Sequence, residues 1–91
     1  MKKSIRITIQ GSMQPVFFNI FIKENADKLG VKGFVRNKED GQVEIFIEGN
    51  MNEVNQMILT CKTGPQHVMI RNVNEKEEKY QGFKDFRIMD F

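Results

Sequence analysis

The stretch VKGFVRNKEDGQVEIFI, residues 31–47, predicts two strands joined by a tight turn. Apolar side chains point to one face of the second strand and acidic ones to the other: Val43, Ile45 and Ile47 against Glu44 and Glu48. The KEDG between the two strands contains Asp40-Gly41, a dipeptide that favours a turn. We therefore expect strands at residues 31–37 and 42–47 that pair as a β-hairpin.

A helix is predicted on each side of this hairpin. Before it, apolar residues follow helical spacing over residues 18–29, and Gly30 supplies a left-handed stop. After it, Asn50 and Glu53 have the spacing of a capping box at the start of a second helix. This second helix ends at Gly64-Pro65 and carries an apolar stripe: Met51, Val54, Met57, Ile58 and Cys61.

Three more strands are predicted at the two ends of the chain. Isoleucines alternate with polar residues over residues 4–9, and two further strands are expected at 67–73 and 83–91. The charge run EKEEK at 75–79 mixes both signs and is interpreted as a solvated hairpin or loop. The order is therefore β-α-β-β-α-β with a C-terminal strand or strand extension, which is typical of the ferredoxin-like fold.

The expected architecture is an α+β two-layer sandwich, with two helices covering one face of an antiparallel sheet. At 91 residues the chain suits one core, so residues 1–91 are expected to form a single domain. A hydrophobic content of 40% and a charged content of 29% fit a soluble globular protein. We expect it to be a monomer.

Composition also limits the partners and the compartment. No apolar run is long enough to span a membrane, and the start MKKSIRIT lacks the apolar core of a secretory signal. A net charge of +2 is too small and dispersed to predict nucleic-acid binding. With one cysteine there is no internal disulfide, which favours a reducing cytoplasm. We therefore expect a cytoplasmic protein that binds neither nucleic acid nor membrane.

The best candidate site is the segment from Gly11 to Phe17, which leaves a strand and enters a helix. Free N–H groups and the helix dipole favour an anion there, although a simple strand–helix connection is the alternative interpretation. The segment contains no Arg or Lys. Elsewhere, Cys61 is interpreted as a buried core residue and His67 as a strand residue, and the two are too few for a structural zinc site.

Two motifs in the chain are similar to those of one known family. The first motif of that family runs glycine, any residue, Val, Gln, Gly, Val, any residue, Phe, Arg. This chain has at those positions Gly11, Ser12, Met13, Gln14, Pro15, Val16, Phe17, Phe18 and Asn19. The second motif, glycine-aromatic-Val-any-Asn with a later Gly-x-Val, is matched by Gly33, Phe34, Val35, Arg36, Asn37, Gly41 and Val43. In these two motifs the chain resembles the acylphosphatase family.

The resemblance implies metal-free and cofactor-free hydrolysis of acyl phosphates, which are small anionic substrates, to carboxylate and phosphate. In this family the N–H groups of the first loop and one arginine hold the phosphoryl oxygens, while an asparagine holds the attacking water. The water-holding role falls on Asn37, although a strand-end asparagine that caps the KEDG turn is the alternative interpretation. The phosphate-binding loop falls on Ser12, Met13, Gln14, Pro15, Val16, Phe17 and Phe18.

Two of the departures from the family pattern affect phosphate binding. The arginine position is occupied by Asn19, which is neutral and too short for a bidentate charged grip. The loss of a comparable arginine costs about 10³–10⁵ in rate. A loop glycine is replaced by Pro15, which fixes φ and has no N–H to donate. Lys23 lies one helical turn beyond Asn19, and Arg36 precedes Asn37 with its side chain expected on the opposite face of the strand.

Three functional hypotheses follow from these residues. The first is an acylphosphatase-like protein with a degraded phosphate cradle and little or no activity. The second is a non-enzymatic binding module that uses residues 11–19 for a small ligand or protein partner, which Val16 and Phe17 anchor if both are exposed. The alternative interpretation of these residues is that Phe18 faces the core and only Phe17 is partly exposed. The third is an active acylphosphatase in which another cation, Lys23 or Arg36, substitutes for the missing arginine.

Overall fold

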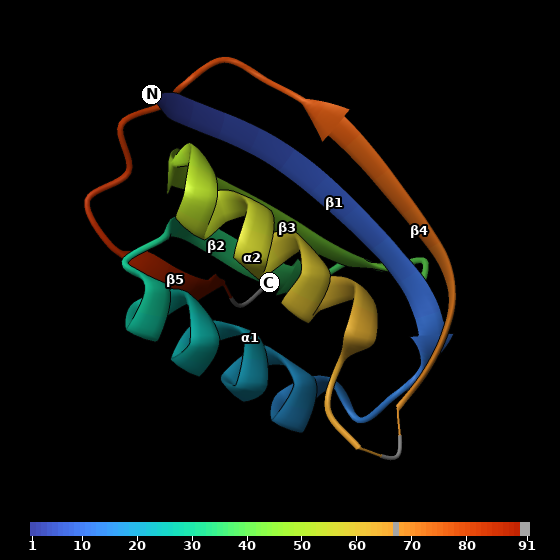
Figure 1. The fold of residues 1–91 in the computed structure, drawn as a ribbon. Helices are drawn as coiled ribbons and strands as arrows, with labels where there is room; N and C mark the ends of the chain where they lie inside the picture. The colour runs from blue at the N-terminus through green and yellow to red at the C-terminus, as the bar shows by residue number, and fades with distance from the viewer. Residues whose placement is uncertain (67, 90–91) are drawn as a thin grey trace.

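The structure is a computed structural model that describes residues 1–66 and 68–89. Its helices and strands follow one another along the chain as Figure 1 shows. They are β1 (Lys2–Ser12), α1 (Pro15–Leu29), β2 (Lys32–Asn37), β3 (Val43–Asn50), α2 (Met51–Thr63), β4 (Met69–Glu77) and β5 (Phe86–Met89).

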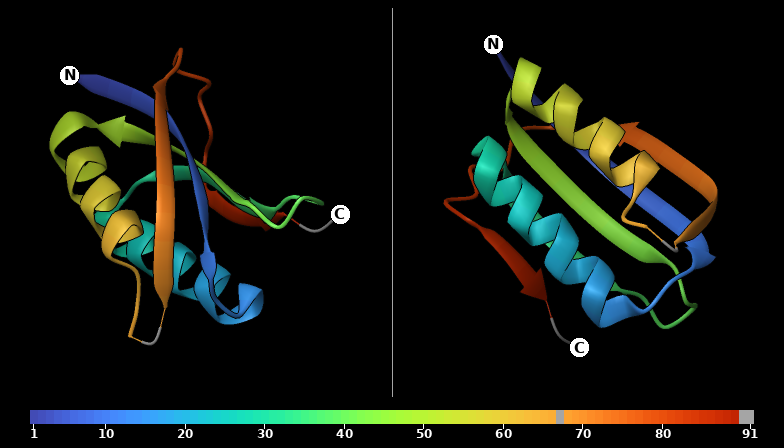
Figure 2. Two further views of the ribbon diagram at one scale, coloured as in Figure 1. Left: turned by 90° about the vertical axis from the view of Figure 1, so that its right-hand side faces the viewer. Right: turned by 60° about the horizontal axis from the view of Figure 1, so that its bottom comes forward.

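The strands form one sheet in the order β4-β1-β3-β2-β5. Neighbouring strands are antiparallel except at one edge, where β5 runs parallel to β2 with Gly33 opposite Phe86. Figure 2 shows both helices on the same side of the sheet, with β4 and β5 at its opposite edges. The α+β two-layer sandwich predicted from the sequence is therefore confirmed, and its sheet is mostly antiparallel.

The core lies between the helices and the sheet, where the predicted apolar faces meet. All three isoleucines of the β1 alternation are buried, as are the matching residues of β3. The stripe of α2 is buried as well except for Met51, which is half-buried at the start of the helix. The first helix ends as expected, because Gly30 adopts φ 73° and its N–H bonds back to the Asp27 carbonyl. The second helix buries Cys61 in this core, as predicted.

Several element boundaries differ from the prediction, most clearly those of α1, β4 and β5. Helix α1 begins at Pro15 rather than Phe18, because proline suits the first helical position, where an N–H would have no helical partner anyway. Strand β4 extends to Glu77, so residues 75–77 of the charge run pair with β1 instead of forming a loop; an edge strand tolerates such charges. Strand β5 covers only residues 86–89. The strand predicted at 67–73 begins at Met69, and His67 lies outside the described residues.

The capping box predicted at the start of α2 is wrong. Asn50 occupies the N-cap position, but its side chain makes no capping hydrogen bond. The backbone N–H of Met51 instead donates to the carbonyl of Met1 at 2.9 Å. A neighbouring strand end thus satisfies one of the N–H groups of the first turn, which the local sequence pattern does not indicate.

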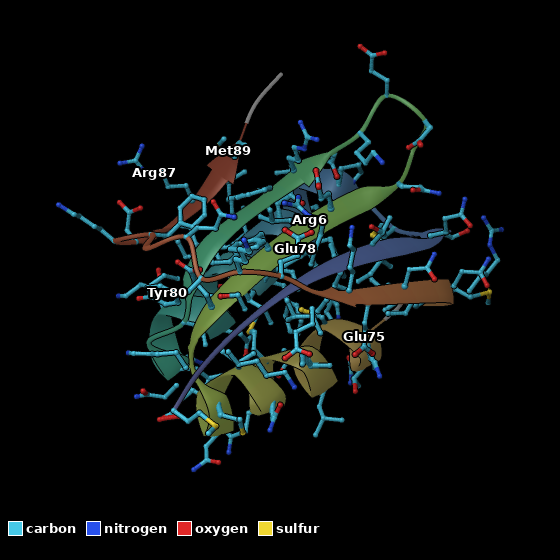
Figure 3. All side chains as sticks on the ribbon, turned by 90° about the horizontal axis from the view of Figure 1, so that it is seen from above. Arg6, Glu75, Glu78, Tyr80, Arg87 and Met89 are labelled. Carbon is cyan, nitrogen blue, oxygen red and sulfur yellow. The ribbon has the colours of Figure 1, made fainter. Side chains whose placement is uncertain are left out.

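The face of the sheet opposite the helices is also partly covered. The segment 78–85, which joins β4 to β5, crosses this face and places Phe83 against two aromatic rings of the hairpin, Phe34 and Phe46. Figure 3 shows Arg6 and Glu78 side by side on this face, and their side chains hydrogen-bond at 2.7 and 3.1 Å. The acidic face predicted for β3 is therefore correct, but Glu44 and Glu48 are buried on it.

Candidate functional site

The candidate site lies where β1 passes into α1. Only Met13 and Gln14 separate the two elements, so the connection is shorter than the loop predicted from the sequence. Gln14 is the N-cap, with φ −89° and ψ 115°, and its carbonyl accepts the N–H of Phe18 at 3.0 Å. The N–H groups of Val16 and Phe17 belong to the first turn, where no helical carbonyl is available to them. They are the donors that an anion would meet at this end of the helix.

Pro15 removes one donor from this first turn without disrupting the helix. It occupies the first helical position, where its fixed φ is compatible with the helix. Glycine in the same place would add an N–H and a wider range of backbone angles. Proline at this position therefore weakens an anion site more than it weakens the fold.

Gly11 serves the packing of two strands. A β-carbon built there would fall well inside contact distance of the Met69 carbonyl oxygen on β4. The register of β1 against β4 also shifts between Gln10 and Gly11. The glycine allows β4 to approach β1 closely just before the chain enters the site.

Asn19, which the motif resemblance assigns to the family's arginine position, is buried, with 6% of its surface exposed. It lies among the core-facing residues of α1, next to Phe18 and one turn before Ile22. Its Oδ1 atom is buried and has no hydrogen-bond partner. A buried acceptor without a partner is costly to a fold, so the side chain is not explained by packing alone.

Asn37, the predicted water-holding residue, lies at the same end of the sheet as this junction. Asn37 and Ile9 both pair with Val43, so their backbones lie about 10 Å apart on either side of it. Because strand side chains alternate and Val35 is buried in the core, Asn37 is on the face that the helices cover. The side chain is exposed, in a hollow lined also by Arg36 and the turn residues 38–40.

The two candidate substitute cations are engaged away from the junction. Lys23 donates from Nζ to Asp27 at 3.1 Å and to the Phe86 carbonyl at 2.9 Å. Phe86 pairs with Gly33, near the start of β2, whereas Asn37 ends that strand. These contacts therefore hold the Lys23 ammonium near the start of β2, at the opposite end of the strand from Asn37.

Arg36 lies on the sheet face opposite the helices, as predicted. Its guanidinium forms an ion pair with the buried carboxylate of Glu44, which also pairs with Arg6. Burial alone would raise the pKa of Glu44, but hydrogen bonds from Arg36 and Arg6 outweigh burial and lower it. The Arg36 charge is thus used to hold a carboxylate on the far face of the sheet.

A groove opens beside the start of α1 and has a volume of about 490 Å³. It runs between α1 and the chain that leaves α2, and it is lined by Gln14, Phe17, Phe18, Ile20, Phe21, Glu24, Pro65, Gln66 and Val68. Phe18 is buried as expected, while Val16 and Phe17 are both exposed, at 68% and 69%. The sequence did not predict this groove, because its two walls come from segments about fifty residues apart.

Other reactive groups do not extend the site. Cys61 is buried, and burial raises the pKa of its thiol to about 12, so the thiol stays protonated at neutral pH. Within residues 1–66 and 68–89, no three His, Cys, Asp or Glu side chains are grouped as metal ligands. Neither helix of the described chain is long and apolar enough to cross a membrane.

Comparisons with known proteins agree on one family. The family model for acylphosphatase matches residues 5–88. An acylphosphatase of Syntrophus aciditrophicus (strain SB) is 39% identical over 90 residues, covering 98% of this chain and 94% of that protein. The crystal structure of acylphosphatase from Bacillus subtilis matches with a TM-score of 0.90 and 31% identity, over 99% of this chain and 100% of that chain. An acylphosphatase from Coxiella burnetii gives a TM-score of 0.89 with 28% identity, over 97% and 93% of the two chains. This chain therefore belongs to the acylphosphatase family.

Proposed function

We propose that this chain binds acyl phosphates at the β1–α1 junction and hydrolyses them slowly. The phosphoryl oxygens accept the N–H groups of Val16 and Phe17, and Asn37 orients a water. The water oxygen forms a bond to phosphorus as the bond from phosphorus to the acyl oxygen breaks. The carboxylate leaves with the electron pair, and the protons of the water pass to phosphate and solvent. A carboxylate is a good leaving group, so the step needs positioning and charge stabilisation above all.

The observation that carries the slow rate is the neutral, buried side chain of Asn19 at the family's arginine position. Without that cation, the charge on the phosphoryl oxygens is met by N–H dipoles alone, which favours a rate about 10³–10⁵ below that of an arginine-bearing site. The contacts of Lys23 with Asp27 and Phe86 favour this impaired enzyme over one with a substitute cation. The ion pair of Arg36 with Glu44, on the sheet face opposite the helices, likewise favours an impaired enzyme over one in which Arg36 substitutes for the arginine.

Hydrolysis of acetyl phosphate by three proteins tests this function: the natural chain, Asn19→Arg, and Asn19→Arg with Pro15→Gly. Each is paired with an Asn37→Ala version, and a ¹⁵N–¹H NMR spectrum confirms that each variant is folded. We expect weak turnover by the natural chain and at least a hundredfold gain in the double variant, lost again in its Asn37→Ala version. Fast turnover by the natural chain would instead identify an active enzyme with another cation.

A non-enzymatic binding module is the second candidate, favoured by the exposure of Val16 and Phe17 at the start of α1. Apolar side chains at a helix start suit contact with a ligand or partner more than retention of a free anion. This function predicts no turnover in any folded variant, including the double one. It also predicts that Val16→Ser with Phe17→Ser abolishes ligand binding at the junction, measured by chemical-shift changes.

A further inference from the structure

The groove beside α1 begins at the residues proposed to hold the phosphoryl group. Gln14 and Phe17 belong both to the β1–α1 junction and to the groove lining. The N–H of Phe17 is one of the proposed phosphoryl donors, while its ring forms part of the groove wall. Phe17 therefore connects the proposed phosphoryl site to the groove. The acyl group of an acyl phosphate bound at the junction would lie next to the groove.

The lining of the groove is mostly apolar. Phe17, Ile20, Phe21, Pro65 and Val68 supply rings and branched aliphatic groups from both walls. Phe17 and Ile20 are 69% and 45% exposed, so they leave apolar surface in water that an occupant would cover. The volume of about 490 Å³ falls in the range of small-molecule sites.

The polar groups of the groove disfavour an acyl group that carries a negative charge. Gln14 and Gln66 are uncharged amides, and Glu24 is the one ionisable side chain among the lining residues that the structure describes. The carboxylate of Glu24 would repel an acyl group that carries its own carboxylate, and none of the described residues that line the groove is a Lys or Arg that could offset this repulsion. The groove thus suits an uncharged acyl group.

We propose that this groove holds the acyl portion of the ligand and selects apolar, uncharged acyl phosphates, aromatic ones above all. The inference rests on the proposed function, because it assumes a phosphoryl group at the junction. An acetyl group is too small to cover Phe17 and Ile20, so it gains little from the groove. A benzoyl group has a larger apolar surface with which to cover both residues and exclude water from them.

Binding of three acylphosphonates tests the proposal, because their carbon–phosphorus bond resists the hydrolysis proposed for the site. The probes are acetylphosphonate, benzoylphosphonate and 4-carboxybenzoylphosphonate, titrated into the full chain and followed by ¹⁵N–¹H NMR. We expect benzoylphosphonate to bind about tenfold more tightly than acetylphosphonate. We expect the added carboxylate to weaken binding by about two- to fivefold, since Glu24 is exposed and its charge is screened.

Two variants test whether the preference for the uncharged benzoyl probe comes from the groove. Ile20→Ser should reduce the benzoyl-to-acetyl affinity ratio at least threefold, and Glu24→Gln should remove the penalty on the carboxybenzoyl probe. Leu59→Ser is the matched control, because Leu59 is an exposed aliphatic residue on α2, 65% exposed, that does not line this groove. Its affinity ratio should equal that of the natural chain.

Equal affinity for the three probes, or no binding of any, would overturn the proposal. So would a preference that Leu59→Ser removes as fully as Ile20→Ser does. Failure of the proposed function is seen separately, as the absence of Asn37-dependent turnover of acetyl phosphate in the double variant. Turnover without probe selectivity refutes only the groove, and selectivity without turnover refutes only the hydrolysis.

Discussion

The carboxylate of Glu48 accepts the backbone N–H of Phe83 at 2.6 Å, although 35 residues separate the two along the chain. Glu48 is fully buried, and it also accepts the N–H of Gln81 at 2.7 Å and the hydroxyl of Ser4 at 3.0 Å. These bonds tie the segment between β4 and β5 to the sheet face opposite the helices. A charged residue thus organises the packing of this second face.

Glu48→Gln is expected to lower the free energy of unfolding by about 2–3 kcal/mol. The amide keeps the shape of the side chain but presents an NH₂ group to one of the buried donors that now meet a carboxylate oxygen. Urea unfolding with an unchanged m value measures the loss. Ser4→Ala, which removes one donor and leaves Glu48 two others, should cost about 1 kcal/mol. Equal losses in the two variants would show that the hydrogen bonds that Glu48 accepts from segment 78–85 add nothing to the free energy of unfolding.

The free energy of unfolding is also expected to fall as the pH drops below about 4.5, which is the ordinary pKa of a glutamate side chain. A hydrogen bond from Arg6 lowers the pKa of Glu78, and bonds from Arg36 and Arg6 lower that of Glu44 against the opposing effect of burial. In this window the unfolded chain binds more protons than the folded one, so acid favours unfolding. The stability that these carboxylates contribute is present above the unfolded pKa and is lost as the pH falls through the folded pKa.

Arg6→Met identifies the source of this acid dependence. The variant removes the partner of Glu78 and one of the two arginines that pair with Glu44. Its urea midpoint should therefore change less than that of the natural chain between about pH 7 and pH 3. Parallel pH profiles for the two proteins would place the dependence in other carboxylates.

Gly41 requires glycine because of its backbone angle alone, whereas Gly33 requires it also because a neighbouring strand lies close to it. Both have positive φ, 137° and 86°, which a side chain rarely adopts. A β-carbon at Gly33 would also collide with the carbonyl of Phe46 on the neighbouring strand, whereas one at Gly41 would meet open space. Gly41→Ala should cost about 1–2 kcal/mol, and Gly33→Ala more than about 3 kcal/mol, by urea unfolding. Similar losses would mean that the backbone shifts to relieve the collision.

The sequence predicted the elements that one local pattern specifies. The alternation of Ile5, Ile7 and Ile9 and the stop at Gly30 are properties of a single strand or helix, and both were confirmed. The burial of Glu48 was not predicted, because its partners come from a distant irregular segment. The same limit applies to the groove beside α1, whose walls meet only in the folded chain. Motif spacing alone placed Asn19 and Asn37, so their roles stay predictions.

Asn19 and Asn25 lie on the same helix but differ in what their amides contact. The Nδ2 of Asn25 donates to the Phe21 carbonyl at 2.8 Å, whereas the buried Oδ1 of Asn19 has no partner. Alanine at either position improves helix propensity by about 0.5 kcal/mol. At Asn19 it also removes an unsatisfied buried acceptor, which costs about 1–3 kcal/mol, and leaves a small void that offsets part of the gain.

We therefore expect Asn19→Ala to raise the free energy of unfolding by about 1 kcal/mol, and Asn25→Ala to leave it nearly unchanged. Urea unfolding of both variants at neutral pH measures the difference. A gain at Asn19 would mean that the natural residue weakens the fold at the position that the motif resemblance assigns to the family's arginine, as a side chain retained for a ligand would do. A loss of more than about 1 kcal/mol would mean that the carboxamide supports the packing of α1, and that its place in the motif reflects structure.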